Sequence, residues 1–372
     1  MSQQSKPPFR ADHVGSLIRP EKLVAAREES ESGGDRAALK RIQEQAIRDV
    51  VTMQEDIGLR LVTDGEYNRG AWHRDFLLRF ENVRLIPSKI TVRFHSAEGT
   101  RDQAPPSWQV AGPLARRKPI FVEDFRYLAS IAKATPKITI PSPTIMHFRG
   151  GREAIDETAY PDMAAFYSDL ARVYAEEIAD LAAAGCRYLQ IDEVNLAYLC
   201  DPALRAQVSN IGEDPASLPR TYARLLNDTI AGRPADMTVC MHLCRGNYAG
   251  AWVAEGGYEP VAELLFNEID VDGYFLEYDS ERAGGFEPLR FLPKGKTAVL
   301  GLVTTKSAKL ESKDDLKRRI DQAARFAPLE QLALSPQCGF ESGIGGNTMT
   351  IEQEAAKLRL IVETAQEVWG TA

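Results

Sequence analysis

The sequence predicts an α/β protein built as a single (β/α)8 TIM barrel with an insertion after the second strand. The first observation is that eight short β-like runs alternate with longer helical stretches, as a closed barrel of this kind requires. The second is that no GxGxxG sequence follows the first run, so the main rival, an open doubly wound sheet, lacks its commonest cofactor signature. The third is that 372 residues suit one barrel with insertions, so we expect one domain over residues 1–372.

The strands are predicted where short apolar runs alternate with helical segments. In chain order, the eight predicted strands are Asp12–Ser16, Leu59–Thr63, Lys137–Ile140, Tyr188–Asp192, Thr238–His242, Gly273–Glu277, Thr297–Leu302 and Gln331–Ser335. Barrel enzymes carry their chemistry at the carboxyl ends of the strands, so polar residues that close these runs are the candidates for a functional site.

The helices are predicted from apolar spacing and from residues that suit helix ends. Residues Asp35–Ile57 carry apolar side chains close to a helical period. The Ala-rich, amphipathic segment Pro161–Ala184 ends at Gly185, a residue type favoured just after a helix. Segment Ser312–Phe326 starts with serine and an acidic first turn, as a helix N-terminus does, and Glu352–Val368 forms the last predicted helix.

One stretch, residues 76–134, interrupts the alternation of strands and helices. It contains short β-like pieces at Val83–Ile86 and Ile90–Phe94. We therefore expect an insertion after the second strand, forming a hairpin or a small sheet over the barrel mouth.

The composition predicts a cytoplasmic protein that acts on small molecules. A net charge of −8 disfavours binding to nucleic acid or to a membrane surface. Residues 1–10 lack the apolar segment of a secretory signal, and no segment approaches the roughly 18 uninterrupted apolar residues of a membrane helix. The five cysteines are an odd number and do not suggest a disulfide framework, so we expect buried thiols or metal ligands. The oligomeric state stays open.

The segment TVCMHLCRGNY, residues 238–248, carries the first two candidate metal ligands. An apolar strand runs into His242 and Cys244, and residues two apart on a strand point the same way. Glu277 ends the next predicted strand, where a buried charge is costly unless it is paired or ligated. Cys338 follows the last strand. One imidazole, two thiolates and one carboxylate suit Zn²⁺ better than Mg²⁺ or Ca²⁺.

The other cysteines are expected to be structural. Cys240 shares the parity of His242 and Cys244, so it is the local rival for the metal. It lies deeper in the strand, and we therefore expect it to pack in the core. Cys186 and Cys200 are likewise predicted to be buried thiols.

A zinc site with this ligand set favours sulfur chemistry. Zn²⁺ deprotonates a bound thiol at neutral pH, and an anionic ligand shell keeps the incoming sulfur electron-rich. We therefore expect the site to activate a sulfur nucleophile and not a water molecule. Zinc sites that activate water for hydrolysis more often use histidine and carboxylate ligands.

These residues resemble the catalytic domain of the cobalamin-independent methionine synthase family, over nearly the whole chain. That family holds zinc with an HxC pair, a later glutamate and a final cysteine, in the order found here. Asp12–Ser16 resembles its opening strand, and the chain matches the short, single-barrel members. The resemblance implies a zinc barrel that transfers a methyl group from a methylfolate to homocysteine without cobalamin.

The resemblance also implies where the amino-acid acceptor binds. Segments Asp64–Glu66 and Ile191–Glu193 resemble the amino-acid-binding segments of the family. Ser16, Glu66 and Asp192 would then bind the carboxylate and ammonium groups of homocysteine. An ammonium group in a partly dry pocket needs fixed negative partners, which the two carboxylates supply. Capping of neighbouring helices, or pairing with Arg69, is the alternative role for these carboxylates.

One departure concerns the proton that the leaving group needs. The family has a histidine after the seventh strand, but the matching stretch Gly301–Lys306 contains none. Lys306 or Thr305 is the candidate substitute, and His13 is a second candidate catalytic residue expected near the barrel mouth.

We therefore expect a zinc-dependent methyltransferase whose partners are a small-molecule thiol and a methyl donor. An alternative keeps the zinc and the thiolate but changes the electrophile, as in epoxyalkane:coenzyme M transferase, which resembles the same family. A third hypothesis, of another class, is a zinc- or thiol-binding protein without catalysis.

Overall fold

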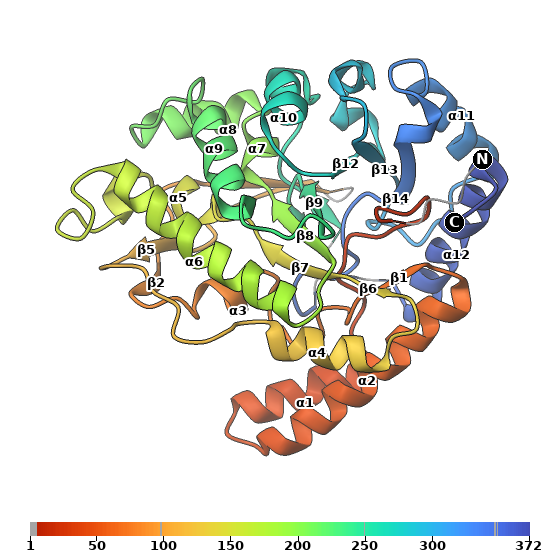
Figure 1. The fold of residues 1–372 in the computed structure, drawn as a ribbon, viewed down its shortest axis with the longest axis horizontal. Coiled ribbons are helices and arrows are strands. Elements are labelled where there is room, and N and C mark those ends of the chain that lie inside the picture. Colours follow the sequence, from red (N-terminus) through yellow and green to blue (C-terminus); the bar gives the residue numbers. More distant parts are fainter. Residues whose placement is uncertain (1–5, 97–98, 249, 346, 348) are drawn as a thin grey trace.

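The computed structural model describes residues 6–96, 99–248, 250–345, 347 and 349–372, and a parallel sheet lies at its centre (Figure 1). Six strands pair in the order β14-β13-β12-β9-β8-β7, every neighbouring pair being parallel. Their bounds are β7 Ile138–Pro141, β8 Tyr188–Glu193, β9 Thr238–Leu243, β12 Gly273–Glu277, β13 Thr297–Val303 and β14 Leu332–Pro336. All six fall where the sequence predicts strands, within two residues at each end.

The second predicted strand is present but short. Strand β1, Leu61–Val62, pairs in parallel with β6, Thr135–Pro136, which leads directly into β7. The Lys137 N–H extends this pairing by donating to the Val62 carbonyl. Strand β1 therefore continues the sheet beyond β7.

The first predicted strand, Asp12–Ser16, is not a regular strand. The segment makes one parallel bridge, Ala11 with Leu334 of β14, and the Asp12 N–H donates to the Leu334 carbonyl. Gly15 then has a φ of +140°, which takes the backbone out of the extended conformation. The prediction of a regular strand at Asp12–Ser16 was therefore wrong.

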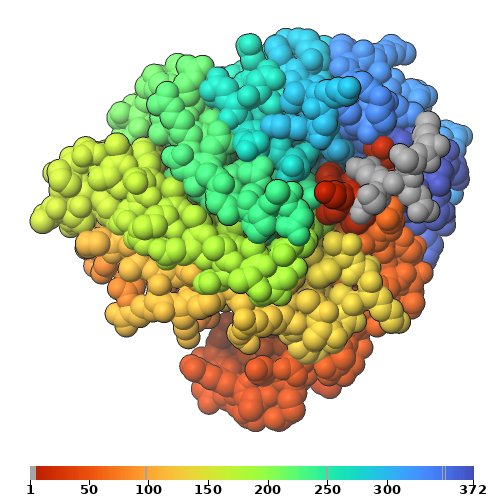
Figure 2. Space-filling view, in the orientation of Figure 1, coloured from red at the N-terminus to blue at the C-terminus, as the bar shows by residue number. Residues whose placement is uncertain are grey.

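Helices cover the outside of the sheet, and the N-terminal pair projects at one end of the molecule, in red and orange (Figures 1 and 2). The predicted helix ends are largely confirmed: Asp35 caps α2 and Ser312 caps α11 through their side chains. The α-helices are α1 Glu21–Glu31, α2 Arg36–Ile57, α3 Arg74–Leu77, α4 Val122–Ile131, α5 Ile145–Phe148, α6 Met163–Ala183, α7 Asn195–Tyr198, α8 Pro202–Asn210, α9 Leu218–Ile230, α10 Ala262–Glu268, α11 Lys313–Ala323 and α12 Ile351–Trp369.

The insertion after β1 forms small antiparallel sheets. Strand β2, Val83–Ile86, pairs with β5, Ser107–Val110. Strand β3, Val92–Ser96, pairs with β4, Gly99–Gln103. The strand predicted at Ile90–Phe94 begins two residues later, at Val92. The chain before it turns, and the Ile90 N–H donates to Ser88 Oγ.

The insertion is joined to the loop that follows β9. Strand β3 pairs with β11, Ala251–Trp252, which pairs in turn with β10, Asn247–Tyr248. The inserted sheet is therefore hydrogen-bonded to the chain just beyond Cys244.

A layer of buried side chains fills the space between the strands. Phe9 and Val14 come from the N-terminal segment and the other side chains from strands, and together they form one cluster: Phe9, Val14, Leu61, Tyr188, Cys240, Phe275, Val299 and Ala333. Cys240 is fully buried, and burial raises the pKa of its thiol, which confirms it as a core residue. Cys186 and Cys200 are also buried, as predicted. Among the residues described, no helix is long and apolar enough to cross a membrane.

Candidate metal centre

The strand register explains how residues distant in sequence meet. Phe275 of β12 lies opposite His242 of β9, so the ends of these two neighbouring strands reach the same edge of the sheet. Cys244 follows β9 directly, and Glu277 is the last residue of β12. Cys338 lies just past the end of β14, which is separated from β12 by β13.

Gly301 of β13 lets the Cys338 loop come close to β12. A Cβ at position 301 would lie 2.7 Å from the Gln337 Cα and 2.8 Å from the Leu276 carbonyl oxygen. Real side chains do not tolerate such distances. A glycine is therefore required for the chain around Cys338 to approach the end of β12.

The four predicted ligands form one compact group. One ligand atom from each of His242, Cys244, Glu277 and Cys338 lies within 4.8 Å of all the others. The two sulfur atoms are 3.5 Å apart. Thiolates at about 2.3 Å from a tetrahedral zinc ion are roughly 3.8 Å apart, so the observed spacing suits that geometry.

The protein leaves the His242 ring free to bind a metal. Both ring nitrogens are buried and have no hydrogen-bond partner, although buried polar atoms are nearly always paired. Burial alone would lower the pKa of His242, but Cys244, Asp192 and Glu277 outweigh it and raise the pKa. This ring therefore lies in a strongly negative environment, which suits a dication.

The two thiols behave as a coupled pair. The hydrogen bond from Cys338 lowers the pKa of Cys244 well below its usual value, and the same contact raises the pKa of Cys338. Gly246 adds an N–H at 3.3 Å from the Cys244 sulfur. The donor set and its unpartnered imidazole thus fit a zinc ion.

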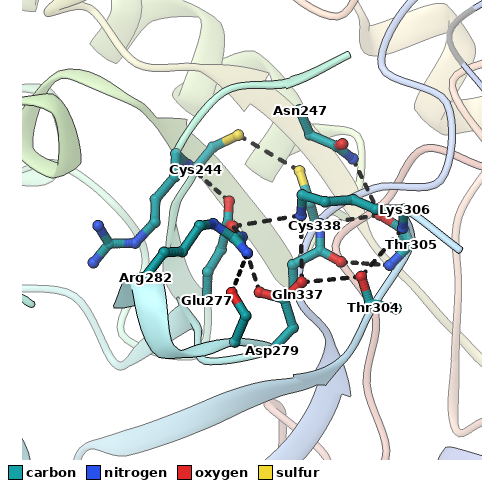
Figure 3. A network of polar contacts seen from close by, with 12 residues as sticks. Cys244, Asn247, Glu277, Asp279, Arg282, Thr304, Thr305, Lys306, Gln337 and Cys338 are labelled. Carbon is teal, nitrogen blue, oxygen red and sulfur yellow. Dashed lines mark hydrogen bonds and ion pairs between the residues drawn. The ribbon is translucent and has the colours of Figure 1, made fainter. Parts of the chain in front are cut away.

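Both oxygens of the Glu277 carboxylate are held by the chain (Figure 3). The Arg245 N–H donates to Oε1 at 2.7 Å, and Arg282 Nη2 donates to Oε2 at 2.7 Å. Burial raises the pKa of Glu277, while Lys306 and Arg282 oppose this rise. Asp279, which lies 2.8 Å from Arg282 Nη2, completes a buried network.

Sequence reasoning missed Arg282 and Asp279. Both stand in a charged loop after β12, where the usual expectation is solvent exposure, yet their side chains are 7% and 3% exposed. The signal available in the sequence was their position, within five residues of Glu277, at the carboxyl end of a strand.

The catalytic roles of Lys306 and His13 stay predictions, and the two side chains have different surroundings. Lys306 Nζ lies 3.4 Å from Asp279 Oδ2 and 3.9 Å from Glu277 Oε2, so its charge is drawn toward carboxylates. His13 is fully buried with Nε2 2.9 Å from Gln54 Oε1, and burial lowers its pKa to about 3. Neither residue is among the described residues that line the cavity beside the metal ligands.

That cavity has a volume of about 540 Å³ and contains the predicted acceptor residues. Its inner end is lined by Ser16, Glu66, Asp192, His242, Cys244 and Cys338. Residues of the insertion, including Leu85 and Phe94, line its outer part. The inserted sheets therefore form part of the wall of this cavity.

Glu66 and Asp192 bring two carboxyl groups to the cavity wall. Glu66 accepts from Thr139 Oγ1 at 2.8 Å through Oε1, whereas its buried Oε2 has no hydrogen-bond partner. Arg69 lies 3.6 Å from the same Oε1, so the alternative pairing is also present. Burial, followed by the charge of Glu66, raises the pKa of Asp192 to about 7.

Ser16 is placed by close contact with the chain after β14. The Phe340 N–H donates to the Ser16 carbonyl. A Cβ at Gly339 would lie 2.0 Å from Ser16 Oγ, so a larger residue there would displace the Ser16 hydroxyl. The hydroxyl of Ser16 thus lines the cavity beside Cys338.

The class of protein follows from a family comparison that agrees with this site. Residues 11–367 match the family described as the cobalamin-independent synthase catalytic domain. The chain belongs to this family.

Individual relatives and a solved structure are similar to nearly the whole chain. It is 44% identical to the uncharacterized protein YxjH of Bacillus subtilis (strain 168), covering 99% of this chain and 96% of that protein. A Listeria monocytogenes protein, solved as a candidate vitamin-B12-independent methionine synthase, superposes with a TM-score of 0.78 at 35% identity, covering 99% of this chain and all of that one. A 5-methyltetrahydropteroyltriglutamate–homocysteine methyltransferase from Mycolicibacterium paratuberculosis is 24% identical over 97% of this chain and 43% of its own length.

Proposed function

We propose that the protein transfers a methyl group from a methylfolate-type donor to the thiol of homocysteine, giving methionine, with zinc held by His242, Cys244, Glu277 and Cys338. The observation that carries the proposal is that these four ligand atoms lie within 4.8 Å of one another, and that His242, Cys244 and Cys338 also line a cavity. Family membership and the named homocysteine methyltransferase relative support it.

The chemistry requires a sulfur nucleophile in a site that water does not dominate. A bound zinc ion supplies this by lowering the pKa of a thiol that it coordinates. The acceptor sulfur then bonds to the methyl carbon, the donor leaves with the electron pair of the broken bond, and the thiol proton is released. Cys338, 3% exposed, and the other buried ligands keep the surroundings of the sulfur dry.

The chain's own residues orient the acceptor. Glu66 Oε2 and Asp192 would accept charge-assisted hydrogen bonds from the ammonium group of the acceptor. Ser16 offers its hydroxyl to the carboxylate of the amino acid. Together these contacts would leave the thiol of the acceptor directed at the metal ligands.

The two carboxyl groups also favour homocysteine over coenzyme M as the acceptor. Coenzyme M carries a sulfonate and no ammonium group, so Glu66 and Asp192 would repel it. Homocysteine is therefore preferred to the acceptor of an epoxyalkane:coenzyme M transferase reaction.

We further propose that the parallel strands close into a single (β/α)8 barrel forming one domain. The support is that the segment carrying Ala11 bridges to Leu334 of β14, while the Leu17 N–H donates to the Gly65 carbonyl just beyond β1. This segment therefore contacts both outer strands of the sheet.

Replacement of Cys338 by serine tests the function. Cys338→Ser should lose both tightly bound zinc and methylation of homocysteine, whereas Cys200→Ala, a buried thiol outside the site, should keep both. Zinc content is measured by elemental analysis, and activity with a methyltetrahydrofolate and homocysteine, with an epoxide and coenzyme M as the comparison pair. Full activity of Cys338→Ser would refute the proposal. Zinc-edge absorption with and without homocysteine should show an added sulfur ligand.

A further inference from the structure

Glu277 accepts a hydrogen bond from Arg282, which is not one of the predicted metal ligands. The same Arg282 nitrogen, Nη2, lies 2.7 Å from Glu277 Oε2 and 2.8 Å from Asp279 Oδ1. The exposed fractions of the three side chains are 7%, 1% and 3% respectively. This is a buried bridge between a predicted metal ligand and a second carboxylate.

Arg282 is itself fixed from other directions. Its Nη1 donates to Ser280 Oγ at 2.6 Å, and its guanidinium carbon lies 5.3 Å from the centre of the Trp252 ring. Trp252 belongs to β11, which pairs with His95 of the insertion. The guanidinium therefore has one defined position between the β12 loop and the inserted sheet.

The arrangement separates the arginine from the sulfur ligands. In Figure 3 the sulfur atoms of Cys244 and Cys338 lie together at one end of the network and Asp279 at the other, with Glu277 between them. Arg282 and Lys306 supply two positive charges to the two negative charges of Glu277 and Asp279. The four side chains together are thus close to neutral. Arg282 can therefore hydrogen-bond to Glu277 while the carboxylate also binds a cation.

We propose that Arg282 is a positioning residue that acts through Glu277, fixing the orientation in which this carboxylate meets the metal. The proposal rests on the proposed function in one respect, that Glu277 is a zinc ligand. Groups that hydrogen-bond to metal ligands orient them, and losing such a group commonly weakens metal affinity by about 10- to 100-fold.

The experiment uses the full chain with three variants. Arg282→Gln removes the charge and the bridge, and Arg282→Lys keeps the charge but loses the planar fork of the guanidinium. Arg290→Gln is the matched control, because Arg290 also pairs with a carboxylate, that of Glu259, but at an exposed position. Zinc affinity is measured by competition with a chelator, and stability by thermal unfolding of the metal-free proteins.

Arg282→Gln should bind zinc about 10- to 100-fold more weakly than the wild type, Arg282→Lys should fall between them, and Arg290→Gln should match the wild type. The metal-free forms of the variants should unfold within a few degrees of one another. Equal or tighter zinc binding by Arg282→Gln would overturn the inference while leaving the proposed function intact. A loss of metal-free stability that accounts for the whole loss of affinity would overturn it too, as a purely structural role. If Arg282→Gln does not fold, Arg282→Lys decides by the same criteria. Absence of zinc binding by the wild type would overturn the proposed function and this inference together.

Discussion

Changing Glu66 to glutamine is expected to weaken homocysteine binding without weakening the fold. Glu66 Oε1 already accepts from Thr139 Oγ1, whereas the buried Oε2 has no hydrogen-bond partner in the protein. The variant removes one charge-assisted hydrogen bond to the acceptor ammonium, which is about 1.5–3 kcal/mol. At 1.4 kcal/mol per factor of ten, KM for homocysteine should rise about 10- to 150-fold.

The stability of the free protein should change little, because two effects oppose each other. Asp192, whose pKa is raised in part by the charge of Glu66, loses a like-charged neighbour in the variant, whereas Arg69, 3.6 Å from Glu66 Oε1, loses its ion pair. Urea unfolding of the ligand-free protein measures the balance of the two effects.

A thiol lacking the amino group, such as 4-mercaptobutyrate, provides the control for this variant. The wild type and Glu66→Gln should use that thiol with similar KM, because neither makes an ammonium contact with it. An equal rise in KM for both thiols, or no rise for homocysteine, would refute the assignment of Glu66 to the ammonium group.

Two further predictions concern charges around the site. Burial, followed by the charge of Asp64, raises the pKa of Asp124 from 3.8 to about 7, so the folded protein binds a proton that the unfolded chain has lost. Stability should then fall as the pH rises from about 4 to 7, by about 4 kcal/mol at most and about 2 kcal/mol once partial exposure is considered. Asp192, whose pKa is also raised to about 7, contributes a fall of the same sign, so Asp124→Asn should make the fall smaller than in the wild type in urea unfolding across pH 5 to 8. Glu123→Gln, at an exposed neighbouring position, should show the wild-type fall, and an equally large fall in Asp124→Asn contradicts the reasoning. Lys306→Arg should retain at least about a tenth of kcat if Lys306 is only the charge partner of Asp279, while a drop of about 10²- to 10⁴-fold would restore its role as proton donor.

The sequence was most informative where regular strands end. His242, Cys244 and Glu277 are candidates because parallel strands bring their carboxyl ends to one edge, and the register of β9 and β12 places them there. Apolar runs are enough to locate such ends, because a parallel strand that is buried on both faces consists almost entirely of apolar residues.

The sequence was least informative where loops converge. Arg282 and Asp279 read as surface charges, and only packing against Trp252 and the Glu277 loop buries them. His13 could not be oriented in advance, because alternation of side chains predicts direction only in a regular strand. The chain from Asp12 onward makes a single bridge and then turns at Gly15, so the imidazole reaches Gln54 instead of the cavity.

The order in which the ligands occur has a consequence for how the protein matures. His242, Cys244 and Glu277 are all synthesised before Cys338, and β14 must dock before that cysteine reaches the others. A nascent chain can therefore hold an ion only in an unfinished coordination shell. Under the proposed function, the zinc site is complete only after the last strand has docked, and a product terminated ahead of Cys338 would lack one of its four ligands.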